Sequence, residues 1–281
     1  MERAVSGARP SNISRTIAQR EKDDYARDGV VCLRAVFDRA WIEYLREAVD
    51  AVLAAPGSHA EEYTAPGRSG RFFGDLDLWK RLPAFRDYVM HSPAAPIAGE
   101  IMGTHKINIF YDQLLVKEPL TAERTPWHQD QPYWAVEGFQ VCSVWLPLDT
   151  VPEETCVAFV RGSHRWGPHC PQHFSDGTPY RDKTLPPLPD IDAGGYDILR
   201  WALEPGDCLV FQAMIVHGAP GNASARHRRR ALSTRWTGDD ARYVKPAGEV
   251  AIPLTDPGLA QGAAMDSAAF PVVWRRESAG P

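Results

Sequence analysis

The stretch of sequence that decides the fold reads INIFYDQLLV at residues 107–116. Within it, residues 107–111 and 114–116 are rich in β-branched, aromatic and other apolar side chains, which favours strand. Four later stretches have the same character: VCSVWL (141–146), VAFV (157–160), CLVF (208–211) and ALSTRW (231–236). Because helical patterns come first and many strands follow, we expect a mainly β barrel or sandwich with flanking helices.

Helical signals dominate the residues before this stretch. The charged stretch 21–28 predicts a helix, and it leads into a predicted strand at 29–33. Asp38 is expected to cap the next helix. Behind it, apolar residues recur at helical spacing: Trp41, Leu45, Ala48, Val49 and Val52.

Proline and glycine mark where regular elements should stop. Residues 85–102 have helical character, which Pro93 and Pro96 are expected to interrupt. Residues 57–70 are rich in Gly, Pro, Ser and charge, and they predict a loop. A long insert that carries Pro and Gly separates two predicted strands at residues 166–200.

The bulk composition is that of an ordinary globular protein. The chain has 281 residues, of which 44% are hydrophobic and 24% charged, enough for a core of normal size. We therefore expect a flexible leader at residues 1–18 and a single domain at 19–281. The net charge of -5 offers no general attraction to nucleic acid or to an anionic membrane. The expected partner is a small-molecule substrate.

The absence of a recognisable targeting signal and the pattern of the cysteines lead us to expect a cytoplasmic protein. No run of about 18 apolar residues exists, so no transmembrane helix is expected. The polar, Arg-bearing residues 1–20 lack the apolar stretch of a secretory signal. The five cysteines are odd in number and have no zinc-site spacing, which favours reduced thiols.

A metal-binding pattern lies between the first two predicted strands of the β-rich half. Trp127-His128-Gln129-Asp130 contains a His-x-Asp pair, and in an extended backbone residues i and i+2 point to the same side. The best third ligand is His217, which ends a predicted strand at 208–216 and precedes Gly218. Two histidines and one carboxylate form the facial triad of non-haem Fe(II) oxygenases, which leaves positions open for O₂ and a bidentate cosubstrate.

The His-x-Asp pair alone is a weak signal. About one His-x-acid match is expected by chance in a chain of this composition. His59-Ala60-Glu61 is a second match, which we set aside because it lies in the predicted 57–70 loop. Taken alone, His128 and Asp130 also fit a polar surface turn, and His217 fits a hydrogen-bonded buried histidine.

The basic run Arg228-Arg229-Arg230 strengthens the iron interpretation. A dicarboxylate cosubstrate needs one end on the metal and the other in a salt bridge, and the planar guanidinium of Arg binds a carboxylate bidentately. We expect two of the three arginines to lie on a solvated face. Arg229 is the predicted inward residue because it shares a strand face with Ser233 and Arg235, and Arg228 stays an alternative.

At this point the sequence resembles the phytanoyl-CoA dioxygenase family, over about residues 117–236 and more weakly back to Asp28. The matching residues are Lys117 before Glu118-Pro119, Trp127-His128-Gln129-Asp130, Trp145, Gly162-Ser163-His164, Glu204-Pro205-Gly206-Asp207, His217-Gly218-Ala219, Gly221-Asn222 and Arg229-Arg230-Ala231-Leu232-Ser233. The resemblance implies a double-stranded β-helix, a jelly-roll or cupin-like barrel. It also implies Fe(II) as cofactor, with 2-oxoglutarate and O₂ as cosubstrates.

The resemblance further implies roles for individual residues. His128, Asp130 and His217 would hold the iron and form the catalytic centre. Arg229, with Ser233 nearby, would bind the far carboxylate of 2-oxoglutarate. The segment from His217 to this arginine is one residue longer than the usual family pattern, which is why Arg228 stays open.

Four more positions are expected to line the site. By resemblance, Trp145 lines the cosubstrate pocket, Gln113 contacts 2-oxoglutarate, and Trp134 matches an aromatic that packs on substrate in a related branch. Residues 71–75 follow a Gly-rich loop, a composition that suits a lid. Phe73 would then cover the substrate, although it also fits a residue that caps the barrel core.

These assignments predict a 2-oxoglutarate-dependent dioxygenase (EC 1.14.11.-) that oxidises a small organic metabolite and releases succinate and CO₂. Hydroxylation is the default outcome, while desaturation, epimerisation and cyclisation stay open. Two other classes also stay open. A cupin-like isomerase or hydrolase with Zn²⁺ or Mn²⁺ would not need Arg229, and a non-catalytic β-barrel binding module would not need the triad.

Overall fold

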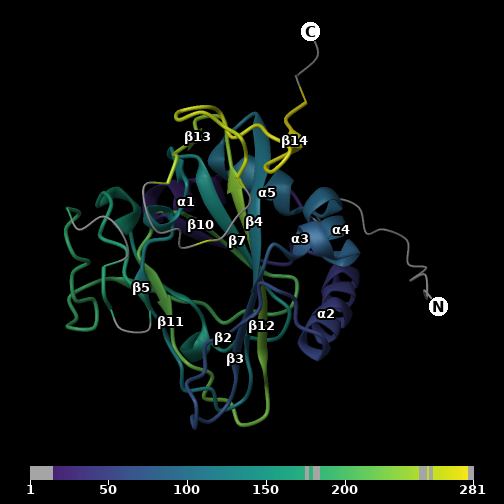
Figure 1. Cartoon of the computed structure of the whole chain (residues 1–281), viewed down its shortest axis with the longest axis vertical. Coiled ribbons are helices and arrows are strands. Elements are labelled where there is room, and N and C mark those ends of the chain that lie inside the picture. The colour runs from purple at the N-terminus through teal and green to yellow at the C-terminus, as the bar shows by residue number, and fades with distance from the viewer. Residues whose placement is uncertain (1–14, 175–176, 180–183, 247–251, 253–255, 278–281) are drawn as a thin grey trace.

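The fold consists of two β-sheets that face each other, with helices against the outer face of the larger sheet (Figure 1). The computed structural model describes residues 15–174, 177–179, 184–246, 252 and 256–277. In this part of the chain the larger sheet runs in the order β1-β10-β7-β12-β4-β3-β2, with β14 also paired to β4. Its strands are β1 (Val30–Leu33), β2 (Glu61–Glu62), β3 (Phe72–Leu76), β4 (Lys106–Lys117), β7 (Val141–Pro147), β10 (Cys208–Gln212), β12 (Arg229–Thr237) and β14 (Val272–Arg275).

The smaller sheet runs in the order β5-β11-β8-β9. Its strands are β5 (Thr125–His128), β8 (Ala158–Val160), β9 (Ile198–Leu199) and β11 (His217–Ala219), while β6 (Val136–Glu137) and β13 (Arg242–Tyr243) form a separate pair. All these pairings are antiparallel. The prediction of a mainly β fold with flanking helices is confirmed, and its two facing sheets are those of a double-stranded β-helix.

Five helices flank the larger sheet, and in Figure 1 α2 to α5 gather on its right-hand side. They are α1 (Gln19–Asp28), α2 (Arg39–Ala54), α3 (Leu78–Arg81), α4 (Pro83–His91) and α5 (Ala94–Met102), with short 3-10 turns at η1 (Gln131–Tyr133), η2 (Glu153–Thr155) and η3 (Ser163–Arg165). Side chains alternate between the two faces of a strand. On β12, Leu232 and Trp236 therefore join the helix-side core, whereas Ala231 faces the smaller sheet.

Most of the elements predicted from sequence are present. The helix at 21–28 and the strand at 29–33 are confirmed by α1 and β1. The five stretches of the β-rich half are confirmed by β4, β7, β8, β10 and β12. The two strands expected within 107–116 are one continuous strand.

Several boundaries differ from the prediction. Asp38 precedes α2 with an extended backbone but makes no side-chain capping bond. The helical stretch 85–102 breaks at Ser92, but Pro96 lies inside α5, where the first turn of a helix tolerates a missing N–H. The predicted 57–70 loop contains β2, which pairs with β3.

The N-terminal prediction falls largely outside the described residues. Of the expected leader at 1–18, residues 1–14 are not described, and α1 begins at Gln19. Among the described helices, none combines the length and the apolar character needed to span a bilayer.

Candidate metal and cosubstrate site

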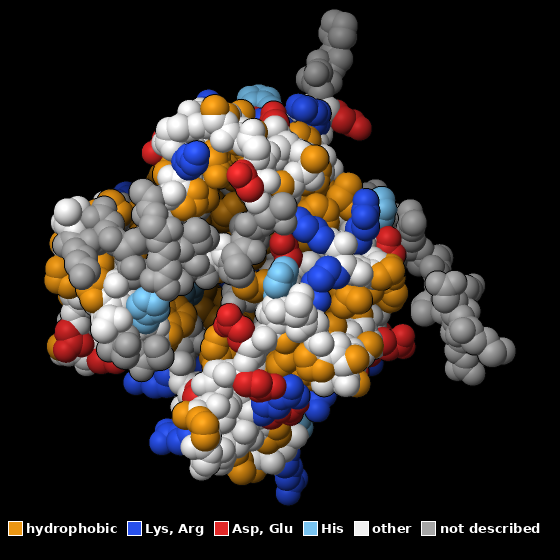
Figure 2. Space-filling view, viewed as in Figure 1, with side chains coloured by type: hydrophobic (Ala, Val, Ile, Leu, Met, Phe, Trp, Pro, Cys, Tyr) orange, Lys and Arg blue, Asp and Glu red, His pale blue; other side chains and the backbone are white. Residues whose placement is uncertain are grey.

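A cavity of about 300 Å³ lies between the two sheets. In Figure 2 the surface is hollowed between the left-hand part of the molecule, which holds the smaller sheet, and its centre. Aromatic side chains form much of the wall: Tyr63, Phe72, Tyr111, Trp134, Trp145 and Phe211. Gly74 lets the Tyr63 ring cross β3, because a Cβ there would lie 2.6 Å from that ring. The few polar groups that reach such an apolar cavity are expected to orient its ligand.

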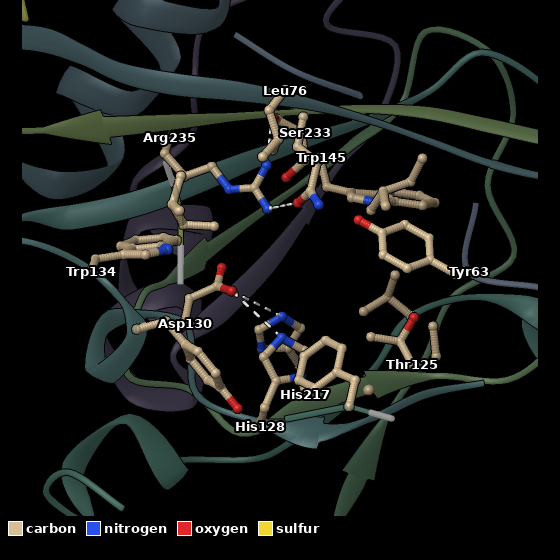
Figure 3. A pocket seen from close by; sticks show the side chains of 18 of the residues that line it. Tyr63, Leu76, Thr125, His128, Asp130, Trp134, Trp145, His217, Ser233 and Arg235 are labelled. Atoms are coloured by element: carbon tan, nitrogen blue, oxygen red, sulfur yellow. Dashed lines mark hydrogen bonds and ion pairs between the residues drawn. The ribbon is translucent and has the colours of Figure 1, made fainter. Parts of the chain in front are cut away.

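The smaller sheet brings the three predicted metal ligands together at one side of this cavity (Figure 3). His128 ends β5 and His217 begins β11, and the two residues are direct partners in the antiparallel register. Asp130 follows two residues after His128. The possible ligand atoms of all three lie within 4.8 Å of one another, and no other such group of His, Cys, Asp or Glu occurs among the described residues.

Two local predictions about these ligands are wrong, although the side chains still converge. Asp130 does not have an extended backbone, because φ is -72° and ψ is -48° where the chain turns into η1. Both Asp130 and Gln131 donate their backbone N–H to the carbonyl of Ala213 at 3.0 Å, which anchors this turn. The strand expected at 208–216 ends at Gln212, and the chain then crosses to the smaller sheet before His217.

Both histidines present the same ring nitrogen to the cavity. Nδ1 of His128 lies 2.8 Å from the carbonyl of Pro126, and Nδ1 of His217 lies 3.0 Å from that of Ile215. A carbonyl oxygen can only accept, so Nδ1 carries the proton and Nε2 keeps its lone pair. The Nε2 atoms lie 3.5 Å (His128) and 3.9 Å (His217) from Oδ1 of Asp130. Three lone-pair donors therefore converge on one point, as a metal ion requires.

The charge states at this point also suit a cation. Burial opposes ionisation of Asp130, but the neighbouring His217, His128 and Arg235 outweigh it and hold the pKa of Asp130 well below its usual value. Burial and the neighbouring His128 lower the pKa of His217 to about 4, so its ring is neutral at pH 7. The hydroxyl of Ser143, 3.3 Å away, donates to the second oxygen of Asp130 and fixes the carboxylate.

Three of the predicted cosubstrate residues line the cavity. Gln113, Trp145 and Ser233 lie side by side on β4, β7 and β12, where Ser233 is the register partner of both others. The hydroxyl of Ser233 is buried and has no hydrogen-bond partner among the described residues. Because a buried hydroxyl is costly to leave unpaired, it indicates a place for a polar ligand atom.

The three consecutive arginines face different surroundings. Arg228 points outward to Asp50 and Glu118. Arg230 was expected on a solvated face, but its side chain is only 10% exposed and pairs with Asp149. Arg229 turns toward the gap between the sheets.

Arg229 is buried without a counterion. Its guanidinium donates to the backbone carbonyls of Thr155 and Pro220, and no described carboxylate forms an ion pair with it. It does not line the cavity itself, but Val157 and Ala219, close in sequence to these two carbonyls, do. Burial lowers the pKa of Arg229 to about 10, so it stays charged at pH 7. A buried cation that meets only neutral acceptors is an incomplete anion site.

Of the two residues predicted to face the substrate, Trp134 lies in the cavity wall and Phe73 does not. Trp134 lines the cavity and packs edge-on against Tyr111, with ring centroids 5.7 Å apart. Phe73 does not reach the cavity, because it faces the helices and is 1% exposed in the main core. Its neighbour Phe72 has the opposite parity and lines the wall instead. The expected lid at 71–75 is mostly β3, a buried strand inside the larger sheet.

Two positions at the candidate site were missed from the sequence. Ser143, which steadies Asp130, sits in an apolar strand that reads as plain core. Arg235 lines the cavity two residues beyond Ser233. Strand parity had already placed Arg235 on the face of Ser233, and this signal was sufficient to find it.

A 2-His-1-carboxylate cluster between the sheets of a double-stranded β-helix defines a class, the non-haem iron oxygenases with a facial triad. Comparison with known sequences narrows this class. The chain belongs to the phytanoyl-CoA dioxygenase family, whose sequence model matches residues 25–231.

Individual relatives are distant. The chain is 25% identical to a probable phytanoyl-CoA dioxygenase of Caenorhabditis elegans over 174 residues, which cover 59% of this chain and 55% of that protein. The matched region thus spans about half the length of that curated relative. This chain is also 21% identical over 245 residues to the ectoine dioxygenase of Sphingopyxis alaskensis, and the match covers 83% of this chain and 79% of that protein.

The solved structures support the fold. The non-haem α-ketoglutarate-dependent carbocyclase SnoK from nogalamycin biosynthesis superposes with a TM-score of 0.72 at 22% identity, covering 94% of this chain and 100% of that chain. At this identity the likeness concerns the fold alone, and it confirms the double-stranded β-helix implied by the family resemblance.

Proposed function

We propose that this chain is an Fe(II)- and 2-oxoglutarate-dependent oxygenase (EC 1.14.11.-) that oxidises a small organic metabolite, with hydroxylation as the default outcome. The observation that carries the proposal is the convergence of His128, Asp130 and His217 between the sheets, together with a buried cation, Arg229, that pairs with no described carboxylate. A metal-dependent isomerase or hydrolase would need the three ligands but not the buried arginine. Family membership supports the same activity.

In this proposal each residue has a distinct task. The carbonyls of Pro126 and Ile215 orient the two imidazoles, and Ser143 orients Asp130, so that Nε2 of His128, Nε2 of His217 and Oδ1 of Asp130 would hold Fe(II). Arg229 binds the far carboxylate of 2-oxoglutarate, and the unpaired hydroxyl of Ser233 donates to the cosubstrate. When bound, Fe(II) with 2-oxoglutarate and O₂ supplies the oxidising power, with release of succinate and CO₂.

The aromatic walls keep water away from the metal face. Trp134 and Trp145 are 5% and 4% exposed although both line the cavity. Exclusion of water strengthens the electrostatic contacts inside a site and prevents side reactions. We assign Trp145 and Gln113 to the cosubstrate and Trp134 to the substrate.

We also propose a cytoplasmic location. All five cysteines are free thiols, and Cys142, Cys156 and Cys208 are buried. Free thiols are typical of a reducing compartment.

The test of the function is a turnover assay with Fe(II), 2-oxoglutarate and O₂ against a panel of small metabolites. We expect succinate release that depends on Fe(II), and a substrate that gains the mass of one oxygen atom. Protein loaded with Zn²⁺ in place of iron is the control and should release none. Turnover of a substrate by the Zn²⁺-loaded protein without 2-oxoglutarate would refute the proposal and favour a hydrolase or isomerase.

A further inference from the structure

A second buried arginine, Arg235, faces the cavity, and the proposed mechanism does not use it. It lies on β12 and is 4% exposed. Its guanidinium donates to the backbone carbonyl of Ser233 and to Oε1 of Gln113, each at 2.7 Å, and in Figure 3 it points into the cavity. Its Nε is buried and has no hydrogen-bond partner in the part of the chain that the structure describes. An arginine cannot lose its charge in a protein, so a full positive charge meets only neutral acceptors here.

The charges of the loaded site leave Arg235 without a counterion. A divalent ion with Asp130 and a dianionic cosubstrate carries one net negative charge, which Arg229 cancels. Among the described residues no carboxylate forms an ion pair with Arg235. Asp130 acts on it from a longer distance and is committed to the metal. Asp112 also acts on it but lies on the opposite face of β4, where it accepts from the backbone N–H of Trp79.

Arg235 lies away from the place proposed for the far cosubstrate carboxylate. Arg229 contacts Pro220, which follows Ala219, and Ala219 pairs with Thr125 on β5. In Figure 3 Thr125 lies across the cavity from Arg235, which is on the side of Asp130. Arg235 and Thr125, the residue near the place proposed for the far cosubstrate carboxylate, therefore lie on opposite sides of the cavity.

The surroundings of Arg235 are aromatic. Its guanidinium carbon lies 4.8 Å from the centre of the Tyr111 ring, a cation–π arrangement that holds the side chain in place. Trp134 packs edge-on against the same Tyr111 and lines the cavity. A ligand anion that pairs with Arg235 would thus bring an attached ring against these side chains and beside the metal face.

We propose that Arg235 determines substrate specificity by binding the carboxylate of a monoanionic substrate whose flat, apolar body lies against Trp134 and Tyr111. The inference rests on the proposed function, because the metal and the cosubstrate must occupy the rest of the site. The cavity of about 300 Å³ is at the small end of ligand sites. Since it also holds the cosubstrate, the substrate is one or two rings in size.

The experiment measures binding of two probes that differ only in charge, 2-naphthoate and 2-naphthamide, by calorimetry. The protein is first loaded with Ni²⁺, a redox-inert substitute for iron, and saturated with 2-oxoglutarate. We expect the wild type to bind the naphthoate at least about 10-fold more tightly than the amide, the lower end of the range for one charge-assisted contact. Arg235→Gln should bind both equally, and Arg235→Lys, which keeps the charge, should retain most of the preference.

Control measurements separate this inference from the proposed function. The affinity for 2-oxoglutarate is measured in the loading step, and both Arg235 variants should match the wild type. Equal melting temperatures exclude a folding defect, and Arg235→Lys keeps the comparison available if Arg235→Gln is unstable. If the wild type fails to bind Ni²⁺ or 2-oxoglutarate, the proposed function and the inference both fall.

Five other results overturn the inference alone. Four of them are a naphthoate that binds no better than the amide, no binding of either probe, a preference that persists in Arg235→Gln, and a naphthoate affinity that falls as 2-oxoglutarate rises. Weaker 2-oxoglutarate binding in Arg235→Gln would likewise overturn it, since Arg235 would then hold the cosubstrate. In all of these cases the proposed oxygenase activity would stand.

Discussion

Replacing Arg229 with glutamine should weaken 2-oxoglutarate binding and also stabilise the ligand-free protein. Burial lowers the pKa of this arginine from 12.5 to about 10. At 1.36 kcal/mol for each pKa unit, its charge costs the folded protein about 3 kcal/mol. At pH 7, below both pKa values, the whole cost is present. The contacts to the carbonyls of Thr155 and Pro220 offset about 1 kcal/mol each, so Arg229→Gln should gain about 1 kcal/mol.

The loss in binding should be larger than this gain. A charge-assisted hydrogen bond to a carboxylate contributes about 1.5–3 kcal/mol, which corresponds to a rise of roughly 10- to 150-fold in the Kd for 2-oxoglutarate. Calorimetric titration of 2-oxoglutarate into Ni²⁺-loaded protein measures the first effect. Thermal unfolding of the ligand-free protein measures the second, which should appear as a rise in Tm of about 2–4 °C.

Arg228→Gln is the matched control. Its side chain is 39% exposed and pairs with Asp50 and Glu118, so its loss should leave the Kd for 2-oxoglutarate unchanged and cost at most about 1 kcal/mol. If Arg228→Gln weakens 2-oxoglutarate binding while Arg229→Gln does not, the anion-site argument is wrong. A Tm of Arg229→Gln below that of the wild type would show that the buried charge of Arg229 does not destabilise the folded protein.

Three further predictions concern residues around the site. Ser143→Ala should weaken Fe(II) binding by about 10-fold, because the hydroxyl that steadies Asp130 is lost; a metal titration with unchanged affinity would contradict this. Asp112 is fully buried and its pKa is raised to about 7 by burial and by Asp77. The folded state therefore keeps a proton that the unfolded chain has lost, and the contribution of Asp112 to wild-type stability should fall as pH rises from about 4 to 7. Asp112→Asn should be more stable than the wild type at pH 8, by up to about 4 kcal/mol in urea unfolding, and close to it at pH 4; a parallel pH dependence of the two proteins would refute the assignment. Phe73→Ala should lose about 3–5 kcal/mol of stability, as expected for a core aromatic, without changing the Kd for 2-oxoglutarate. A variant of unchanged stability that binds 2-oxoglutarate more weakly would show that Phe73 belongs to the site.

The sequence predicts the strands well where residue type alone decides them. The β-branched and aromatic residues of β7 and β12 prefer a pleated, buried surface, and the predicted and observed bounds nearly coincide. It predicts turns of the chain less well. The αR backbone at Asp130 and the crossover before His217 depend on contacts with Ala213, a residue distant in sequence from Asp130, which no local pattern reveals.

The alternation of side chains along a strand predicts which way a residue faces only where the strand itself and the surroundings of its two faces are known. On β12, a face shared with Ser233 was enough to indicate an inward Arg229, and the structure does turn it between the sheets. On β3 the strand itself was not foreseen, so Phe73 was assigned to the cavity although its neighbour Phe72 lines it. The buried ion pair of Arg230 with Asp149 was likewise hidden, because Asp149 lies in the bend after β7, far in sequence from Arg230 on β12.

The central claim, that His128, Asp130 and His217 hold an iron ion that 2-oxoglutarate chelates, can be tested by one anaerobic titration. Fe(II) is added to the protein with 2-oxoglutarate, and the metal-to-ligand charge-transfer absorption of the chelate is recorded. We predict a band that saturates at one iron per chain in the wild type and in His59→Ala, and no band in Asp130→Ala or His217→Ala. A band of full intensity in either triad variant, or none in the wild type, would contradict the claim.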